Sequence, residues 1–207
     1  MQQHTADVTH TSKGPHAGPP HLCGSSDLLL GFVNTTPHGS EPVELLGDSA
    51  CLAAWLAEAG LMEDGAAVTQ ADVVAAHELR DALCTIFLTH SGCVNRAEIL
   101  PEAEQYLQRT AERYPLTLKI TGDGCRLAPS QTGVLGAFGG LLAAAADLDS
   151  RGAWMRVKMC KNTNCYSGFF DKTRNSSGLY CSTACSSQAS QRAYRNRVKD
   201  AACAQPS

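Results

Sequence analysis

The sequence has few aromatic residues and no long uninterrupted apolar run. Trp, Tyr and Phe together make up 6% of the 207 residues, and the longest apolar stretch, from Thr132 to Ala146, is interrupted by four glycines. A helix that crosses a membrane needs about 20 consecutive apolar residues, so we expect no membrane-spanning segment. The Ala- and Leu-rich remainder is typical of a globular protein with a helical core.

A secretory signal is also missing. The first residues, Met1-Gln2-Gln3-His4, have no basic segment, and no apolar segment follows before Asp27. We therefore expect a cytoplasmic protein, in which thiols stay reduced. Under reducing conditions, a well-spaced group among the ten cysteines favours metal ligation over disulfides.

Acidic residues are scarce in the last part of the chain. Residues 151–207 contain 10 Lys and Arg but 2 Asp and Glu, a net charge of +8, whereas residues 1–150 contain 7 and 18, a net charge of −11. Charge separated in this way predicts two modules with different partners. The expected organisation is a disordered, His- and Pro-containing tail over residues 1–26, an acidic helical domain over 27–150, a basic module over 151–200 and a short tail over 201–207.

Apolar spacing and capping residues predict a mainly helical N-terminal domain with one β-hairpin. The expected elements are a short buried segment over 28–35 (strand or helical turn), a helix from the N-cap Asp48 to Gly60, a helix from Thr69 and Asp72 to about His90, a helix from Pro101 to Tyr114 that buries Tyr106 and Leu107, a hairpin over 116–127 with its turn at 122–124, and an apolar helix over 132–148.

No catalytic arrangement can be named in residues 27–150. This segment has no nucleophile elbow, no phosphate-binding loop and no His-x-x-x-His pair, and His77 and His90 are isolated. Gly136, Gly139 and Gly140 lie within an apolar helix without a preceding strand, which favours helix packing over dinucleotide binding. We therefore expect that the protein is not an enzyme.

Four cysteines near the C-terminus have the spacing of a metal site. A C-x4-C pair and a C-x3-C pair are separated by fifteen residues. Zinc prefers four soft ligands in a tetrahedron, and each close pair can supply one edge of it. Turn-forming residues inside each pair, and aromatic residues on both sides of a polar segment, predict a hairpin and then a helix after the last cysteine, as in treble-clef or ribbon-like fingers. The four residues are Cys160, Cys165, Cys181 and Cys185.

A structural zinc ion is the favoured occupant of this site. A module of about 50 residues has too little core to fold alone, and a site of four cysteines without an open position is typical of structural zinc. An iron–sulfur cluster and a chance pairing of cysteines are the alternatives. Five further cysteines show no metal spacing and are expected to be mostly small buried residues: Cys51, Cys84, Cys93, Cys125 and Cys203.

Basic residues gather in and after the four-cysteine segment, and Lys158 and Lys161 add to them. On a helix, four side chains would fall within about 60° of one another: Gln188, Arg192, Arg195 and Lys199. Nucleic acid is the natural polyanionic partner, because contacts from Lys and Arg to phosphates dominate its affinity. The alternatives are a solvated helix face, or a zinc-stapled protein–protein adaptor whose basic face docks on an acidic partner or on residues 1–150. The expected nucleic-acid contacts are Lys172, Arg174, Arg192, Arg195, Arg197 and Lys199.

The C-terminal segment resembles the CGNR zinc-finger family. The matching stretches are Arg156–Cys160, Cys165, Phe169–Asn175, Tyr180–Ser182 and Ala193–Arg197. Upstream, three shorter stretches are similar to the N-terminal domain that usually accompanies this finger: Leu30–Thr35, Trp55-Leu56 and Ala59–Leu61.

The resemblance covers about residues 27–200 and implies a bacterial, stress-induced transcription regulator. It implies four cysteine ligands for zinc, a signature loop with Asp171, Arg174 and Asn175, and double-stranded DNA as the partner. The helical domain would be a sensor or dimerisation module, with a small-molecule effector or a second copy as its partner. The family's four letters should begin at the last ligand, but this chain reads Cys185-Ser186-Ser187-Gln188. Arg192 and Arg195 are therefore expected to replace the absent Asn and Arg.

Overall fold

The computed structural model describes residues 24–38, 43–92 and 100–203. Most of the tail predicted over residues 1–26 lies outside this part of the chain, and the first helix already begins at Ser25. The elements are α1 (Ser25–Val33), α2 (Ser49–Glu58), α3 (Gln70–His90), α4 (Leu100–Arg113), β1 (Leu116–Thr121), β2 (Gly124–Pro129), α5 (Gly133–Ser150), the 3-10 turn η2 (Trp154–Arg156), β3 (Val157–Met159), β4 (Gly168–Phe170) and α6 (Thr183–Cys203).

The helix ends follow the capping signals in the sequence. The Asp48 side chain accepts the Cys51 N–H at 2.8 Å and begins α2. At the start of α3, Thr69 and Asp72 form a reciprocal capping box, which satisfies amide groups that a helix N-terminus otherwise leaves unpaired. Gly60, with φ +69°, follows the last residues of α2. These predicted boundaries are confirmed.

The core lies between α1, α3 and α5. Of the segment over 28–35, for which a strand and a helical turn both remained open, residues 28–33 form the end of helix α1 and bury Leu29, Phe32 and Val33. By length and composition alone, helix α5 could cross a membrane. Its buried residues, however, belong to this core. A Cβ on Gly140 would lie 2.7 Å from Leu61 Cδ2. The glycines of α5 therefore allow close packing, as predicted.

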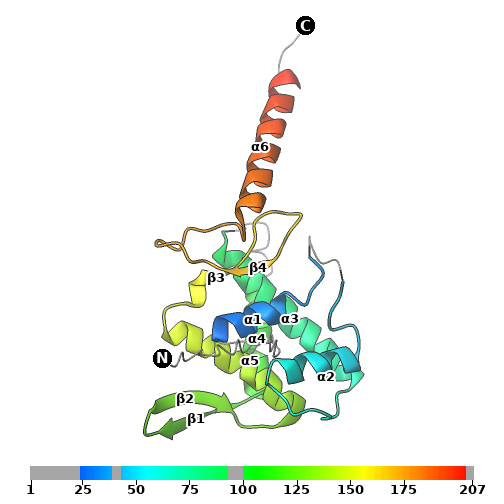
Figure 1. Ribbon diagram of the computed structural model, residues 1–207, viewed down its shortest axis with the longest axis vertical. Coiled ribbons are helices and arrows are strands. Elements are labelled where there is room, and N and C mark those ends of the chain that lie inside the picture. The colour runs from blue at the N-terminus through cyan, green and yellow to red at the C-terminus, as the bar shows by residue number, and fades with distance from the viewer. Residues whose placement is uncertain (1–23, 39–42, 93–99, 204–207) are drawn as a thin grey trace, which may run out of the picture.

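The hairpin of β1 and β2 extends from the helical body (Figure 1). Its turn is formed by Gly122 and Asp123, and β2 packs against α5. The apolar side chains on one face of the hairpin are exposed, by 57% for Leu118 and 75% for Ile120. In α4 the burial also differs from expectation: Tyr106 and Leu107 are only partly buried, because Ala103 and Thr110 face the core.

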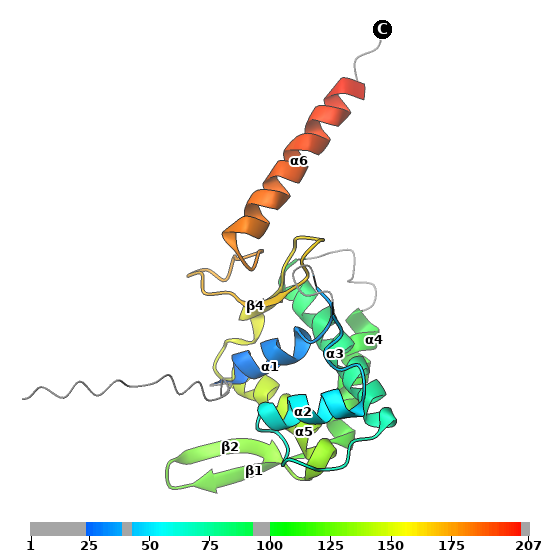
Figure 2. The same cartoon turned by 45° about the vertical axis from the view of Figure 1, so that its right-hand side comes forward.

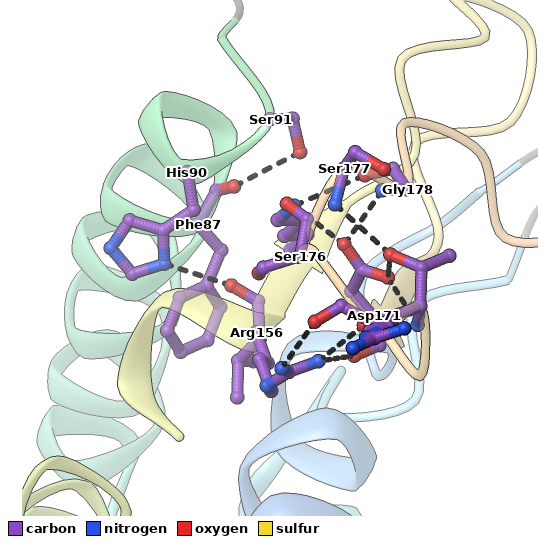
Figure 3. Close-up of polar contacts among 12 residues, drawn as sticks. Phe87, His90, Ser91, Arg156, Asp171, Ser176, Ser177 and Gly178 are labelled. Atoms are coloured by element: carbon purple, nitrogen blue, oxygen red, sulfur yellow. Dashed lines mark hydrogen bonds and ion pairs between the residues drawn. The ribbon is translucent and has the colours of Figure 1, made fainter. Parts of the chain in front are cut away.

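The second hairpin, β3 with β4, packs directly on the helical body. Val157 and Met159 of β3 are buried and belong to the same core as α3. Two side chains at the end of α3 bind carbonyl groups of β3: His90 Nδ1 donates to Val157 at 2.8 Å (Figure 3), and Ser91 Oγ donates to Met159 at 2.5 Å. Beyond this hairpin, α6 extends away from the body as an isolated helix (Figures 1 and 2).

Candidate metal centre and basic helix

The four predicted cysteines meet between the β3–β4 hairpin and α6. Their Sγ atoms all lie within 4.8 Å of one another. Cys181 Sγ lies 3.6 Å from Cys165 Sγ and 3.7 Å from Cys185 Sγ. A tetrahedral zinc ion with Zn–S bonds of about 2.3 Å requires sulfur–sulfur edges of about 3.8 Å. The cluster therefore has the size and the donor set that suit a zinc ion.

Each ligand is held by a local turn. Cys160 directly follows β3, and its N–H donates to the Ser167 carbonyl at 2.8 Å. The N–H of Cys165 donates to the Asn162 carbonyl at 2.8 Å, which closes the turn between the first two ligands. The N–H of Cys181 points at Cys160 Sγ, 3.5 Å away. Such amide donors stabilise thiolates at a metal site.

Helix α6 begins at Thr183 and not after Cys185, so the last ligand lies in its first turn. The Cys185 N–H donates to Ser182 Oγ at 3.2 Å, in the manner of an N-cap. The N-terminus of a helix favours negative charge, and this position suits a thiolate ligand. The sequence-based boundary was wrong because the C-x3-C spacing is compatible with a helix as well as with a turn.

The thiols of the cluster differ in how readily they ionise. A side-chain hydrogen bond from Asn162 is the main cause that lowers the pKa of Cys185 to about 7. Burial raises the pKa of Cys165 and, together with hydrogen bonds to neighbouring thiols, that of Cys181. Four thiolates at this spacing repel one another unless a cation neutralises them. A divalent metal supplies that charge and releases the thiol protons on binding.

The predicted basic residues fall into two groups. Arg192 is partly buried and donates to Thr163 Oγ1 at 2.6 Å, and Asn162 Nδ2 donates to Gln188 Oε1 at 3.0 Å. These contacts fix α6 on the metal-binding turn, so Arg192 has a structural contact that sequence reasoning missed. The other predicted contacts are exposed: Lys172, Arg174, Arg195, Arg197 and Lys199.

Lys158 is not part of the basic surface. Its side chain is 3% exposed, and its Nζ forms an ion pair with Asp171 at 2.7 Å. The alternation of Val157, Lys158 and Met159 correctly places Lys158 on the opposite face of β3 from the core. That face is covered by the segment after β4, and this covering gave no signal in the sequence.

The cysteines outside the metal cluster do not follow one rule. Cys84 is buried, as expected, but Cys51 and Cys125 are exposed. Cys51 lies near the exposed start of α2 and Cys125 lies in the protruding hairpin, where the core does not cover them. Cys23, Cys93 and the side chain of Cys203 lie outside the described residues.

The isolated histidines and Arg80 of α3 have partners within the fold. His77 Nε2 lies 3.0 Å from the Leu46 carbonyl. The Arg80 guanidinium binds both carboxylate oxygens of Glu44 at 2.7 Å. Together with the contact of His90 to β3, these interactions fix loops and strands to α3.

Comparison with known families agrees with this geometry. Residues 26–151 match the ABATE family model, which is described as "putative stress-induced transcription regulator", and residues 156–198 match the CGNR zinc finger. Neither description names a catalytic activity. No curated protein matches this chain. The chain belongs to the ABATE family and carries a CGNR zinc finger with four clustered cysteines suited to zinc.

Proposed function

We propose that this protein is a zinc-dependent transcription regulator that contacts duplex DNA through α6. The observation that carries the proposal is the exposure of this helix. It spans Thr183–Cys203 and extends away from the body (Figures 1 and 2). A helix of this length is about 30 Å long, and the major groove of DNA accommodates a helix.

The charges on α6 support a polyanionic partner. Arg195, Arg197 and Lys199 are exposed, and no ion pair in the described ranges engages them. Arg195 and Lys199 lie one turn apart on the same stripe, and Arg197 lies on the opposite side. The first stripe suits one strand of phosphates, and Arg197 can reach a second when the helix lies in a groove.

Zinc has a mechanical role in this proposal. The base of α6 is held by Cys185 and by the contacts of Gln188 and Arg192 with the first metal-binding turn. Most helical stability in proteins comes from tertiary packing, and α6 extends away from the body beyond its base (Figures 1 and 2). Zinc binding therefore fixes both the position and the order of the DNA-contacting helix.

A protein–protein adaptor is the second candidate. Tyr194 and Val198, one turn apart on α6, are 63% and 51% exposed, and an exposed apolar pair favours a protein partner. Docking of α6 on the acidic body of the same chain has less support, because the finger contacts that body through its strands while α6 extends away (Figure 2).

The experiment uses the full-length, zinc-loaded protein and a fluorescent duplex of mixed sequence. Binding is measured by anisotropy over a series of salt concentrations. Arg195→Ala with Lys199→Ala should weaken binding and reduce the slope of log affinity against log salt by about 1.8, because each lost phosphate contact removes about 0.9. Lys119→Ala with Arg126→Ala is the matched control, since these two exposed residues pair across the β1–β2 hairpin. Equal affinity of the two variants for the duplex would contradict the role of α6. If Tyr194→Ala instead abolished binding of a protein partner, that result would favour the adaptor.

The helical body would provide the regulatory function. A groove of about 580 Å³ lies between the hairpin and α5, with Leu118, Leu127 and Ala143 in its wall, and its size suits a small-molecule effector. The exposed apolar face of the hairpin, on which Ile120 is the most exposed side chain, would suit a second copy. The proposed setting is the cytoplasm, where reduced thiols remain available to zinc.

A further inference from the structure

The segment Asp171–Gly178, which we call the Asp171 loop, is folded around one buried carboxylate. Asp171 is 1% exposed. Its Oδ1 accepts the Thr173 N–H at 2.9 Å and the Thr173 hydroxyl at 2.7 Å, and its Oδ2 accepts the Gly178 N–H at 2.7 Å. Both ends of the loop are therefore tied to the same side chain (Figure 3).

Two basic side chains complete this arrangement. Lys158 Nζ binds Asp171 Oδ2 and also donates to the carbonyl groups of Ser176 at 2.6 Å and Gly178 at 3.2 Å. Arg156 Nη1 donates to the carbonyls of Asp171 at 2.9 Å and Thr173 at 2.7 Å. All three donors of the ammonium group are used inside the loop, so Lys158 has no capacity left for an external ligand.

The loop is also sterically fixed. A Cβ on Gly178 would lie 2.7 Å from Asp171 Oδ1, so this position requires glycine. Ser176 adopts φ +52°, a region that non-glycine residues occupy at a cost of about 1 kcal/mol or more. Such a conformation persists when its surroundings fix it, and here the bond from Lys158 to the Ser176 carbonyl does so.

The outer edge of the loop carries charge that the fold does not use. Lys172 and Arg174 are exposed, and no ion pair in the described part of the chain engages either of them. The one carboxylate of the loop is neutralised by Lys158. The loop therefore presents positive charge from a rigid backbone, between the two cysteine pairs that hold the metal.

We infer that the Asp171 loop is a second nucleic-acid contact, in which Lys172 and Arg174 bind phosphates, and Asp171 and Lys158 act as positioning residues. This inference rests on the proposed function of α6. Ordering a long side chain or its loop on binding costs about 0.5–1.5 kcal/mol for each side chain. A loop that is already fixed by a buried ion pair avoids part of that cost.

The contact itself is tested with Lys172→Ala combined with Arg174→Ala, two surface changes that leave the internal bonds of the loop intact. In the anisotropy assay with the full-length, zinc-loaded protein, the salt slope should fall by about 1.8. Zinc content and the thermal unfolding midpoint should stay unchanged. The hairpin variant Lys119→Ala with Arg126→Ala is again the matched control, with the same loss of charge. An unchanged salt slope for the loop variant overturns the inference.

The positioning role is tested with Asp171→Asn in a mutant cycle. Alone, this variant should retain zinc and lose affinity for the duplex. Added to Lys172→Ala with Arg174→Ala, it should cause little further loss, because the residues through which it acts are already absent. A purely structural role would instead give an additive loss in affinity. Loss of stoichiometric zinc in Asp171→Asn would also overturn the positioning role, since the pair would then be required for the metal site.

The two proposals fail in different ways. If the α6 variant loses affinity and the loop variant does not, the proposed function stands and the second contact is wrong. If neither variant differs from the hairpin control, both are wrong.

Discussion

The side chain of Asn34 pairs with both backbone groups of Gly168. Asn34 Oδ1 accepts the Gly168 N–H at 2.7 Å, and Asn34 Nδ2 donates to the Gly168 carbonyl at 3.2 Å. The amide thus takes the place of a neighbouring strand beside β4. Because Asn34 directly follows α1, this contact connects the first helix of the body to the zinc finger, 134 positions later.

Gly168→Ala should destabilise the full-length protein. A Cβ at this position would lie 2.8 Å from Val33 Cγ2 and 3.2 Å from Asn34 Oδ1, and overpacking of this kind typically costs about 1–3 kcal/mol. Urea unfolding followed by circular dichroism measures the change. Gly122→Ala is the control, since nothing lies within 4 Å of a Cβ there. Equal unfolding free energies for the two variants would show that Gly168 is not a close-packed position.

Removal of zinc should disorder α6. Cys160→Ser or treatment with a strong chelator should abolish stoichiometric zinc and lower helicity in the far-ultraviolet circular dichroism spectrum, because α6 depends on its metal-bound base. The exposed thiol Cys125, replaced by serine, is the control and should keep one zinc per chain. Full metal content in Cys160→Ser would remove this residue from the ligand set.

Stability should fall as the pH decreases below about 6.5. Burial is the main cause that lowers the pKa of His90, and the charge of Lys158 adds to it. The unfolded chain then takes up a proton at a higher pH than the folded chain, so the contribution of the neutral imidazole is lost between the two pKa values.

Unfolding free energies of the wild type and of His90→Asn, measured over this pH range, check the prediction. Asparagine can still donate to the Val157 carbonyl but does not titrate, so its curve should be flatter. Parallel curves for the two proteins would assign the pH dependence to other groups.

Glu44→Ala should destabilise the helical body by about 1–3 kcal/mol. Arg80 is 4% exposed and would keep only the Thr35 hydroxyl as a side-chain partner. Burial raises the pKa of Glu44, but hydrogen bonds from Arg80 and the Leu46 N–H outweigh this effect and hold the pKa below its ordinary value. Chemical denaturation measures the loss, with the exposed Glu63→Ala as the control. A loss no larger than that of the control would show that water replaces the carboxylate.

The sequence allowed prediction of features that depend on local chemistry. Asp48 and Thr69 cap helices because their side chains reach amide groups only three residues away. The two cysteine pairs could be recognised for the same reason, because the two ligands of each pair lie close together in the sequence. The family resemblance was then confirmed over residues 26–151 and 156–198.

Contacts between distant segments could not be predicted. Asn34, Ser91 and His90 attach the finger by binding backbone groups, which every residue offers and which therefore leave no mark in the sequence. Lys158 appeared to be one more surface cation. Its burial depends on a loop whose path is decided by Asp171 and Gly178, and only the folded structure shows that path.

Because the finger and the body share one core, the finger cannot be exchanged freely between related chains. The two family matches meet between residues 151 and 156, which would look like a natural point for a fusion. Val157 and Met159, however, lie in the core of the body. A finger transplanted at this point without Asn34 and the end of α3 would leave its own apolar strand uncovered. A working chimera must therefore carry those residues from the donor, and chimeras made with and without them would differ in solubility.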